Sequence, residues 1–342
     1  MQRCIQLAKN GLGTSYPNPL VGSVIVKNDR IIGEGWHQKA GMPHAEVNAF
    51  ASVGKEFSLE GATLYVSLEP CSHFGKTPPC ADLIISKRVR KVVIGSTDPN
   101  PKVAGNGIKK LREAGCEVIT GILERECIEL NKRFFRFHQK KRPYIFLKWA
   151  QTSNGFIAPL KQARNETKPV WITNAYSRQL VHKMRSEEMA ILVGTQTVLD
   201  DNPSLTVRDW AGSNPLRLVI DRKLQIPDTY SIFDPQAKTI VFNERESRSS
   251  DNIEYVIINF NAKLPEQISE VLFKKNIQSL IVEGGAKTLQ SFVEANIWDE
   301  AWVFTGPNSF EGGIEAPGFY GNLFSRQKIK EDVLDIFKHS TS

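Results

Sequence analysis

One histidine and two cysteines within the first 80 residues have the types and spacing of a zinc site with an open position. His44 follows Pro43, and eight residues separate Cys71 from Cys80. Three such ligands leave the fourth tetrahedral position of zinc to a water, whereas a structural zinc normally has four protein ligands. Glu46 lies two residues after the histidine and offers a carboxylate that can move this water's proton. The pattern therefore predicts a hydrolytic zinc site.

These residues can share a site only if they lie at the ends of structural elements. On an ideal helix the side chains of His44 and Glu46 point about 200° apart, so they converge only at a first turn. We therefore expect a helix to begin here. Cys71 follows a predicted strand, 62–69, and Cys80 opens the next helix, whose N-terminal dipole favours a thiolate. For any one residue alone, a surface histidine or a small buried cysteine is the better interpretation, but the four together favour the metal site.

Short apolar runs alternate with helical patterns along the whole chain, which predicts α/β layering in two domains. A chain of 342 residues with 41% hydrophobic content is long enough for two cores. The charged cluster 140–142, ended by Pro143, is the predicted linker and divides the chain into domains 1–142 and 143–342. In the first domain we expect strands 21–27, 31–37, 62–69, 91–98 and 117–120, and helices from about 43, from 79, at 108–114 and at 124–139.

Composition limits the classes of function. No run of about eighteen apolar residues occurs, and Arg3 and Lys9 interrupt the first segment, so we expect no membrane span, no signal peptide and a cytoplasmic protein. Five scattered cysteines do not form a disulfide framework, which fits a reducing compartment. The net charge of +7 could indicate a nucleic-acid partner, but the basic residues are interleaved with acidic ones, so we expect none.

The spacing of the cysteines narrows a resemblance to the cytidine deaminase superfamily. Members acting on nucleosides or on tRNA adenosine typically have two residues between these cysteines, whereas this chain has eight. The segment 69–80, together with 16–19, 37–41 and 98–101, is instead similar to the deaminase domain of the bifunctional riboflavin-biosynthesis deaminase/reductases. This resemblance covers about the first 140 residues and implies a cytidine-deaminase-like three-layer α/β/α domain.

The resemblance also implies roles for single residues of this first domain. His44, Cys71 and Cys80 match the zinc ligands of the family, and Glu46 matches its proton shuttle. The implied substrate is a diaminopyrimidinone that carries a ribosylamine 5-phosphate. The matching substrate contacts are Asn18, His37, His73 and Lys76. A lysine on the extended loop is suited to a phosphate, although a surface loop with no role would also explain Lys76.

Charged residues occur within or at the ends of predicted elements in the second half. Lys148 lies in the strand 144–152, and Arg185 lies in the last turn of a helix that Thr173 or Asn174 caps. Later, Glu283 ends an apolar strand before a Gly-Gly turn and a further helix. This arrangement points backbone N–H groups at a phosphate, but a tight turn without a ligand explains it equally well.

Taken in order, these segments resemble the reductase domain of the same family, which has a dihydrofolate-reductase-like α/β fold and uses NADPH. The resemblance covers roughly 144–305. It implies that Lys148 and Asp201 are catalytic and lie near the ribose, where hydride adds to an opened, imine-like C1′. The implied substrate contacts are Arg185, Leu205, Arg208 and Glu283. The implied cofactor contacts are Gln151, Trp171, Thr197, Asp201, Gly285, Ala286, Lys287 and Thr288.

Three departures weaken the reductase resemblance. The turn 152–155 reads Thr-Ser-Asn-Gly instead of Ser-Leu-Asp-Gly, the insert 159–168 is long and charged, and after Thr305 we expect a short tail in place of a full closing strand region. A degenerate reductase domain that serves as a dimer scaffold therefore stays open. So do a nucleoside or tRNA deaminase with an unrelated appended domain and a noncatalytic zinc-stabilised module.

The favoured hypothesis is a bifunctional enzyme of riboflavin synthesis. It would hydrolytically deaminate the pyrimidine with Zn²⁺ and then reduce the ribosyl side chain to ribityl with NADPH. We expect a small-molecule substrate, no nucleic-acid or membrane partner, and possibly a homo-oligomer.

Overall fold

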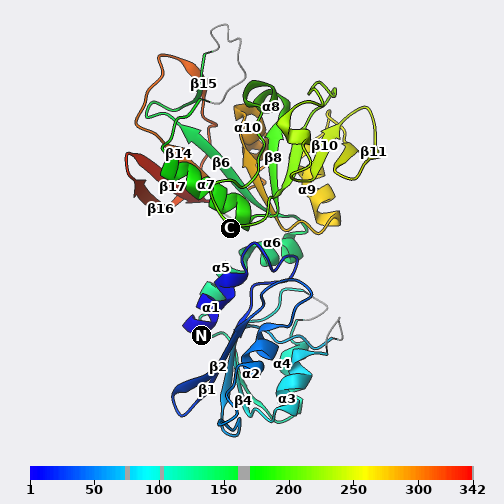
Figure 1. Cartoon of the computed structure of the whole chain (residues 1–342), viewed down its shortest axis with the longest axis vertical. Coiled ribbons are helices and arrows are strands. Elements are labelled where there is room, and N and C mark those ends of the chain that lie inside the picture. The colour runs from blue at the N-terminus through cyan, green and yellow to red at the C-terminus, as the bar shows by residue number, and fades with distance from the viewer. Residues whose placement is uncertain (74–77, 101–103, 161–169, 341–342) are drawn as a thin grey trace. The chain divides into compact units, whose positions relative to one another are not determined.

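The computed structural model describes residues 1–73, 78–100, 104–160 and 170–340 in two compact units, Met1–Lys141 and Arg142–Ser342 (Figure 1). Most of the insert 159–168 lies outside the described residues. Among the described residues, no helix combines the length and the apolar character needed to cross a membrane.

Unit Met1–Lys141 is built on a five-stranded sheet of order β2-β1-β3-β4-β5, in which β3, β4 and β5 are parallel and β1 is antiparallel to both of its neighbours. Its strands are β1 Gly22–Lys27, β2 Arg30–Trp36, β3 Thr63–Leu68, β4 Lys91–Ser96 and β5 Glu117–Ile119. Asn28 and Asp29 join β1 to β2 with φ of 48° and 57°, as a two-residue hairpin turn requires. All five expected strands are confirmed, with ends that differ by no more than two residues.

Helices cover both faces of this sheet, which gives the expected three layers. The helices are α1 Gln2–Ala8, α2 Ala45–Ala51, α3 Cys80–Ser86, α4 Asn106–Glu113, α5 Glu124–Leu130 and α6 Lys132–Lys140, with the 3-10 turn η1 Lys9–Gly11. Buried apolar residues of α2, α3 and α4 pack with Leu64, Val92 and Ile94 on one face (Figure 1). Cys4 and Leu7 of α1 pack with Val24 on the other face.

The single helix expected at 124–139 is wrong, because the chain breaks at Asn131 into α5 and α6. The Asn131 side chain accepts a hydrogen bond from the Leu20 amide and donates one to the Leu20 carbonyl, both at 2.8 Å. Asn131 itself has φ −104° and ψ 21°, outside helical values. A pair of hydrogen bonds to a segment 111 residues away therefore outweighs the local helical pattern.

Unit Arg142–Ser342 is built on a ten-stranded sheet of order β11-β12-β10-β9-β8-β13-β6-β14-β17-β16. The strands from β12 to β14 are parallel, and the sheet ends in antiparallel partners on both sides. Their bounds are β6 Tyr144–Gln151, β8 Ala190–Gly194, β9 Leu216–Ile220, β10 Thr239–Asn243, β11 Arg248–Ser249, β12 Ile253–Ile257, β13 Ser279–Glu283, β14 Glu300–Thr305, β16 Asn322–Ile329 and β17 Asp332–Lys338. A separate small sheet pairs β7 Phe156–Pro159 with β15 Gly313–Glu315.

The expectation of a short tail after Thr305 is also wrong. β16 and β17 form a hairpin. β17 also pairs with β14, and the paired residues run from Glu300 with Lys338 to Thr305 with Val333. Leu334 of β17 is buried against Val181 and Phe304, which stabilises this strand in the sheet. The hairpin thus extends the sheet at this edge, with β16 as its last strand.

Helices lie on both faces of this sheet as well. They are α7 Ala175–Glu187, α8 Thr195–Asp201, α9 Leu264–Lys274 and α10 Ala286–Glu294, with the 3-10 turn η2 Ser231–Phe233. Asn174 is the cap of α7, since its side chain accepts hydrogen bonds from the amides of Tyr176 and Ser177. The main core packs α9 and α10 against the sheet, whereas Met184 of α7 packs on the other face with Phe146.

Candidate active sites

The three predicted metal ligands come together at the ends of their elements. His44 is the residue before α2, Cys71 follows β3, and Cys80 is the first residue of α3. One ligand atom from each lies within 4.8 Å of the others. Glu46 is buried in the first turn of α2, where the geometry requires it if it is to share the site with His44.

The distances between these ligand atoms fit a tetrahedral zinc ion. His44 Nδ1 lies 3.3 Å from Cys80 Sγ and 3.6 Å from Cys71 Sγ. Zn–N bonds near 2.0 Å and Zn–S bonds near 2.3 Å at tetrahedral angles place such atoms about 3.5 Å apart. The donor set, one imidazole and two thiols, is also one that zinc prefers. The residues present therefore fit the ion.

The local electrostatics favour one ionised thiol and a carboxyl that holds its proton more tightly. Hydrogen bonds from Cys80 and His44 lower the pKa of Cys71 to about 4, although its burial opposes this. Burial raises the pKa of Glu46 to about 6, and the nearby Cys71 charge adds to the rise. The hydrogen bond to Cys71 raises the pKa of His44. The ionised thiol of Cys71 is thus available as a ligand for a cation.

Two of the predicted substrate contacts form a hydrogen-bonded row beside His44. Asn18 Nδ2 lies 3.0 Å from His37 Nε2, and His37 Nδ1 lies 3.1 Å from the Pro43 carbonyl. The carbonyl fixes the proton on Nδ1, so Nε2 accepts from Asn18. Burial lowers the pKa of His37, which keeps the ring neutral. The rings of His37 and His44 are 5.4 Å apart in an edge-on arrangement.

The other two predicted contacts are not placed in this row. His73 is exposed, and Lys76 lies outside the described residues. Near His73 are two carboxyl groups, those of the buried Glu69 and the half-buried Asp98, to which the sequence argument gave no role. Glu69 accepts hydrogen bonds from the backbone amides of Asp98, Gly105, Gly107 and Ile108.

Glu69 and Asp98 follow the adjacent parallel strands β3 and β4, and this position is the signal that could have revealed them. Burial raises the pKa of Asp98 to about 6, and the charge of Glu69 contributes to the rise. Asp98 and the residues 105–108 are therefore held at the same edge of the sheet as the metal ligands.

In unit Arg142–Ser342 the structure brings together Lys148, Arg185 and Glu283. Lys148 and Glu283 are direct neighbours on the parallel strands β6 and β13. Lys148 Nζ lies 2.8 Å from Glu283 Oε1, and Arg185 Nη2 lies 3.0 Å and 3.1 Å from the two carboxylate oxygens. All three side chains are at most 15% exposed. Burial raises the pKa of Glu283, but the charges of Arg185 and Lys148 outweigh it and lower that pKa to about 2.

The glycine turn after β13 packs closely on α8. Gly284 and Gly285 have φ of 92° and 68°, and a Cβ on Gly284 would lie 2.9 Å from the Thr197 methyl group. Thr288 lies against the same surface, since its hydroxyl would be 3.7 Å from a Cβ on Gly285. The turn thus brings three predicted cofactor contacts together, and Ala286 and Lys287 continue from it as the start of α10.

Leu205 and Arg208 lie in the segment 202–208 that follows α8. Leu205 is buried with a φ of 53°. The Arg208 side chain is exposed and donates to Ser204 Oγ, while its backbone amide donates to His182 Nδ1 at 3.2 Å. His182, which the sequence argument missed, therefore fixes the backbone of a predicted substrate contact. No local sequence pattern marks it.

Two of the predicted cofactor contacts, Gln151 and Trp171, contact residues other than Lys148, Arg185 and Glu283. Gln151 points to the face opposite Lys148, as the alternation along β6 requires, and accepts a hydrogen bond from Trp149 Nε1 at 2.8 Å. Trp171 is 59% exposed and stacks on Arg178, with 4.6 Å between the guanidinium carbon and the ring centre. Asp201 is the last residue of α8.

Two family models match the chain. The "RibD C-terminal domain" model matches residues 143–333, and the "cytidine and deoxycytidylate deaminase zinc-binding region" model matches residues 1–96. The first of these covers more than half of the chain.

Proteins named riboflavin biosynthesis protein RibD are similar over most of their length. The one from Aquifex aeolicus is 41% identical over 92% of this chain and 88% of its own. The one from Escherichia coli is 37% identical over 90% of this chain and 86% of its own.

Solved structures are similar over both units. A Thermotoga maritima structure, named a diaminohydroxyphosphoribosylaminopyrimidine deaminase/5-amino-6-(5-phosphoribosylamino)uracil reductase, is 40% identical with a TM-score of 0.90, over 99% of this chain and 97% of that one. An Acinetobacter baumannii RibD structure is 32% identical with a TM-score of 0.87, over 98% and 97%.

The N-terminal part is thus a cytidine-deaminase-like domain with a zinc-binding region, and the C-terminal part is a reductase domain related to NADPH-dependent reductases. One chain therefore contains both the deaminase and the reductase domain that the favoured hypothesis requires. The chain belongs to the RibD family of bifunctional deaminase/reductases of riboflavin biosynthesis.

Proposed function

We propose that unit Met1–Lys141 deaminates a diaminopyrimidinone ribosylamine 5-phosphate, and that unit Arg142–Ser342 reduces the ribosyl side chain of the product to ribityl. This substrate is the one implied by the name of the similar Thermotoga maritima structure. In the first reaction a water enters and ammonia leaves. In the second, two hydrogens are added to the sugar.

In the first reaction, His44, Cys71 and Cys80 would hold the zinc ion. When bound, the ion lowers the pKa of a water from its bulk value to near 7. Glu46 is the proton carrier: it takes a proton from the attacking water and delivers it to the departing amine. Its burial in the first turn of α2, next to the ligand cluster, supports this role. Glu46 is not needed as a fourth ligand, which leaves it free to accept and release a proton.

Asn18 and His37 would orient the pyrimidine beside the metal. Their mutual hydrogen bond and the fixed Nδ1 proton of His37 make a rigid polar surface next to His44. His73 and Lys76 would contact the ribose phosphate, for which the exposure of His73 and the charge of a lysine are suitable.

In the second reaction, NADPH supplies the hydride when it is bound. Lys148 and Asp201 would hold and move the proton that accompanies hydride addition at the opened sugar. Glu283 keeps the Lys148 ammonium group at a fixed place, 2.8 Å away. Arg185, Leu205, Arg208 and Glu283 would bind the substrate, and an arginine pair suits its phosphate.

The cofactor would lie against the glycine turn and the neighbouring helices. The turn consists of Gly284 and Gly285, and α10, whose first backbone N–H groups can face a phosphate, begins directly after it. The proposed contacts are Gln151, Trp171, Thr197, Asp201, Gly285, Ala286, Lys287 and Thr288. Gln151 and Trp171 would contact the cofactor from outside the cluster of Lys148, Arg185 and Glu283.

The observation that carries this proposal is the cluster of His44, Cys71 and Cys80 with a buried Glu46 beside it. The test is mass spectrometry of the products that the whole chain forms from the diaminopyrimidinone ribosylamine phosphate, with and without NADPH. We expect deamination alone without NADPH and a further gain of two hydrogens with it. Deamination with no change on adding NADPH would refute the reductase assignment.

Glu46→Gln separates chemistry from metal binding in the same assay. We expect zinc content and NADPH-dependent reduction of the deaminated intermediate to be unchanged, while the deamination rate falls at least 100-fold. Glu34→Gln is the matched control, because Glu34 only pairs with Arg3 on the surface. Full deaminase activity in Glu46→Gln would instead favour a metal site without a catalytic role.

A homo-oligomer and a cytoplasmic location also belong to the proposal. The first is tested by light scattering of the purified protein, and the second by fractionation of the source cells.

A further inference from the structure

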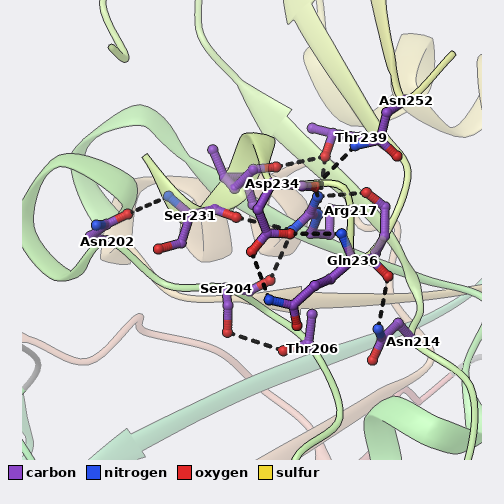
Figure 2. A network of polar contacts seen from close by, with 12 residues as sticks. Asn202, Ser204, Thr206, Asn214, Arg217, Ser231, Asp234, Gln236, Thr239 and Asn252 are labelled. Atoms are coloured by element: carbon purple, nitrogen blue, oxygen red, sulfur yellow. Dashed lines mark hydrogen bonds and ion pairs between the residues drawn. The ribbon is translucent and has the colours of Figure 1, made fainter. Parts of the chain in front are cut away.

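Arg217 is the second residue of β9, whose sequence Leu-Arg-Leu-Val-Ile is otherwise apolar. Its side chain is 0% exposed, so the guanidinium group must find all of its hydrogen-bond partners inside the protein. Figure 2 shows the polar network around it, and the reductase mechanism proposed above does not use this network.

Every N–H of the Arg217 guanidinium group faces an acceptor. Nε donates to Thr239 Oγ1 at 3.0 Å, and Nη1 donates to the Ser231 carbonyl at 3.0 Å and to Asp234 Oδ1 at 2.8 Å. Nη2 donates to the carbonyls of Asp234 and Ala237. The planar fork thus holds three carbonyl groups of the segment 231–237, and a lysine, with three donors on one nitrogen, cannot reproduce this arrangement.

The segment 202–208 is connected to Arg217 and to the segment 231–237 at three points (Figure 2). The Ser231 amide donates to Asn202 Oδ1 at 2.7 Å. Arg217 Nη1 itself reaches the Ser204 carbonyl at 3.4 Å. Asn214 completes the connection, because its side chain accepts from the Val207 amide at 2.8 Å and donates to the Gln236 carbonyl at 3.0 Å.

Between these points Leu205 has a backbone conformation that leucine rarely adopts. Its φ of 53° lies in the left-handed region, which costs free energy for a residue with a branched side chain. The carbonyl before Leu205, that of Ser204, is held by Arg217, and the carbonyl after it, that of Thr206, is held by Arg185 at 3.3 Å. Two buried arginines therefore hold the carbonyl directly before the strained residue and the carbonyl one residue after it.

We infer that Arg217 is a positioning residue of the reductase site, which holds the segment 202–208 in the shape that presents Leu205 and Arg208 to the substrate. This inference rests on the proposed substrate contacts of these two residues. Arg217 acts only through the segment, because its guanidinium group is enclosed and its donors are all used within the protein. Loss of the Arg217 guanidinium group should make the segment 202–208 less well fixed and leave the rest of the sheet unchanged.

Arg217→Lys in the full chain tests the inference through steady-state reduction of the deaminated intermediate. We expect the KM for this intermediate to rise at least tenfold, while the KM for NADPH changes less than twofold and the deaminase kcat is unchanged. A merely structural role predicts a lower melting temperature and fewer active molecules with an unchanged KM. An unchanged KM for the intermediate therefore overturns the inference.

Arg142→Lys is the matched control. Arg142 also forms two hydrogen bonds with a buried aspartate, Asp299, and one with a carbonyl in the same unit, but it has no contact with the segment 202–208. We expect Arg142→Lys to lower the stability of the unit, as Arg217→Lys does, and to leave the KM for the intermediate unchanged. A tenfold rise in this control would overturn the specific role of Arg217.

Asn214→Ala keeps the test possible if Arg217→Lys fails to fold. Asn214 is exposed, so its loss should leave the melting temperature within about 2 °C while it breaks one of the three connections. We expect the KM for the intermediate to rise about threefold. If wild-type protein reduces no intermediate at all, the proposed function fails, whereas an active wild type with an unaffected Asn214→Ala variant refutes only the positioning role.

Discussion

Glu283→Gln is the substitution whose effect on stability the structure predicts most sharply. The Glu283 carboxylate lies between Lys148 and Arg185, and all three groups are largely buried. Glutamine has nearly the same shape but no charge, so the net charge of the three groups changes from +1 to +2. The two cations then repel each other where little water is present to screen them.

The pKa of Glu283 gives the size of the effect. A carboxyl with a pKa near 4.3 in the unfolded chain and about 2 in the folded protein contributes about 3 kcal/mol at neutral pH. Breaking a buried ion pair typically costs about 3 to 5 kcal/mol, which agrees with this value. For a unit of about 200 residues, a loss of about 3 kcal/mol lowers the melting temperature by about 6 to 12 °C.

The free energy of unfolding can be measured by urea titration with tryptophan fluorescence. Five of the six tryptophans, at 149, 171, 210, 298 and 302, belong to the reductase unit, so the signal reports mainly on it. Glu254→Gln is the matched control. Its partner Lys275 is as close, at 2.7 Å, but the two side chains are 37% and 33% exposed, so we expect a loss below about 1 kcal/mol.

The dependence on pH distinguishes charge from shape. Because the folded-state pKa of Glu283 is lowered, its contribution is fully present above the unfolded pKa and is lost as the pH falls toward the folded value. The difference between wild type and Glu283→Gln should stay near 3 kcal/mol down to about pH 5 and fall to about half by pH 3. A difference that is the same at pH 7 and pH 3 would refute the reasoning.

Three further predictions follow from contacts in the two units. Removal of zinc with a chelator, or Cys71→Ser, should abolish deamination but leave NADPH-dependent reduction intact; metal content and both rates measured on one sample check this, and loss of both activities would contradict it. Glu69→Gln should destabilise the deaminase unit by about 1 to 3 kcal/mol, measured by calorimetry, because an amide oxygen cannot satisfy all four backbone amides that the carboxylate accepts. Asn174→Ala should cost about 1 kcal/mol of reductase-unit stability through loss of the α7 cap, and a neutral result in urea titration would show that the cap is dispensable.

The sequence alone predicts the features that depend on local patterns. The metal ligands are predictable because each lies at the end of an apolar run or at a helix start, and those ends meet at one edge of a sheet. The strands of the deaminase unit are predictable because their apolar residues are bounded by turn residues such as Asn28 and Asp29.

Features that depend on distant partners are not predictable in this way. The break at Asn131 depends on Leu20, 111 residues away, and the burial of Arg217 depends on the segment 231–237. The closing strand β17 also escapes prediction, since its burial against α7 cannot be read from a short tail with several charged residues. Arg185 and Glu283 are each visible as polar residues at element ends, and Lys148 is visible as a charged residue within an apolar strand, but only the fold joins them.

The close packing of Gly284 on Thr197 has a consequence for changing the cofactor preference of this enzyme. A Cβ at position 284 would lie 2.9 Å from the threonine methyl group, and one at position 285 would lie 3.1 Å from its hydroxyl. Substitutions in the turn 284–285 therefore have to be combined with a substitution in α8. Libraries that diversify positions 284 and 285 need a smaller residue at 197 in the same clone, because either change alone produces a steric clash or a cavity.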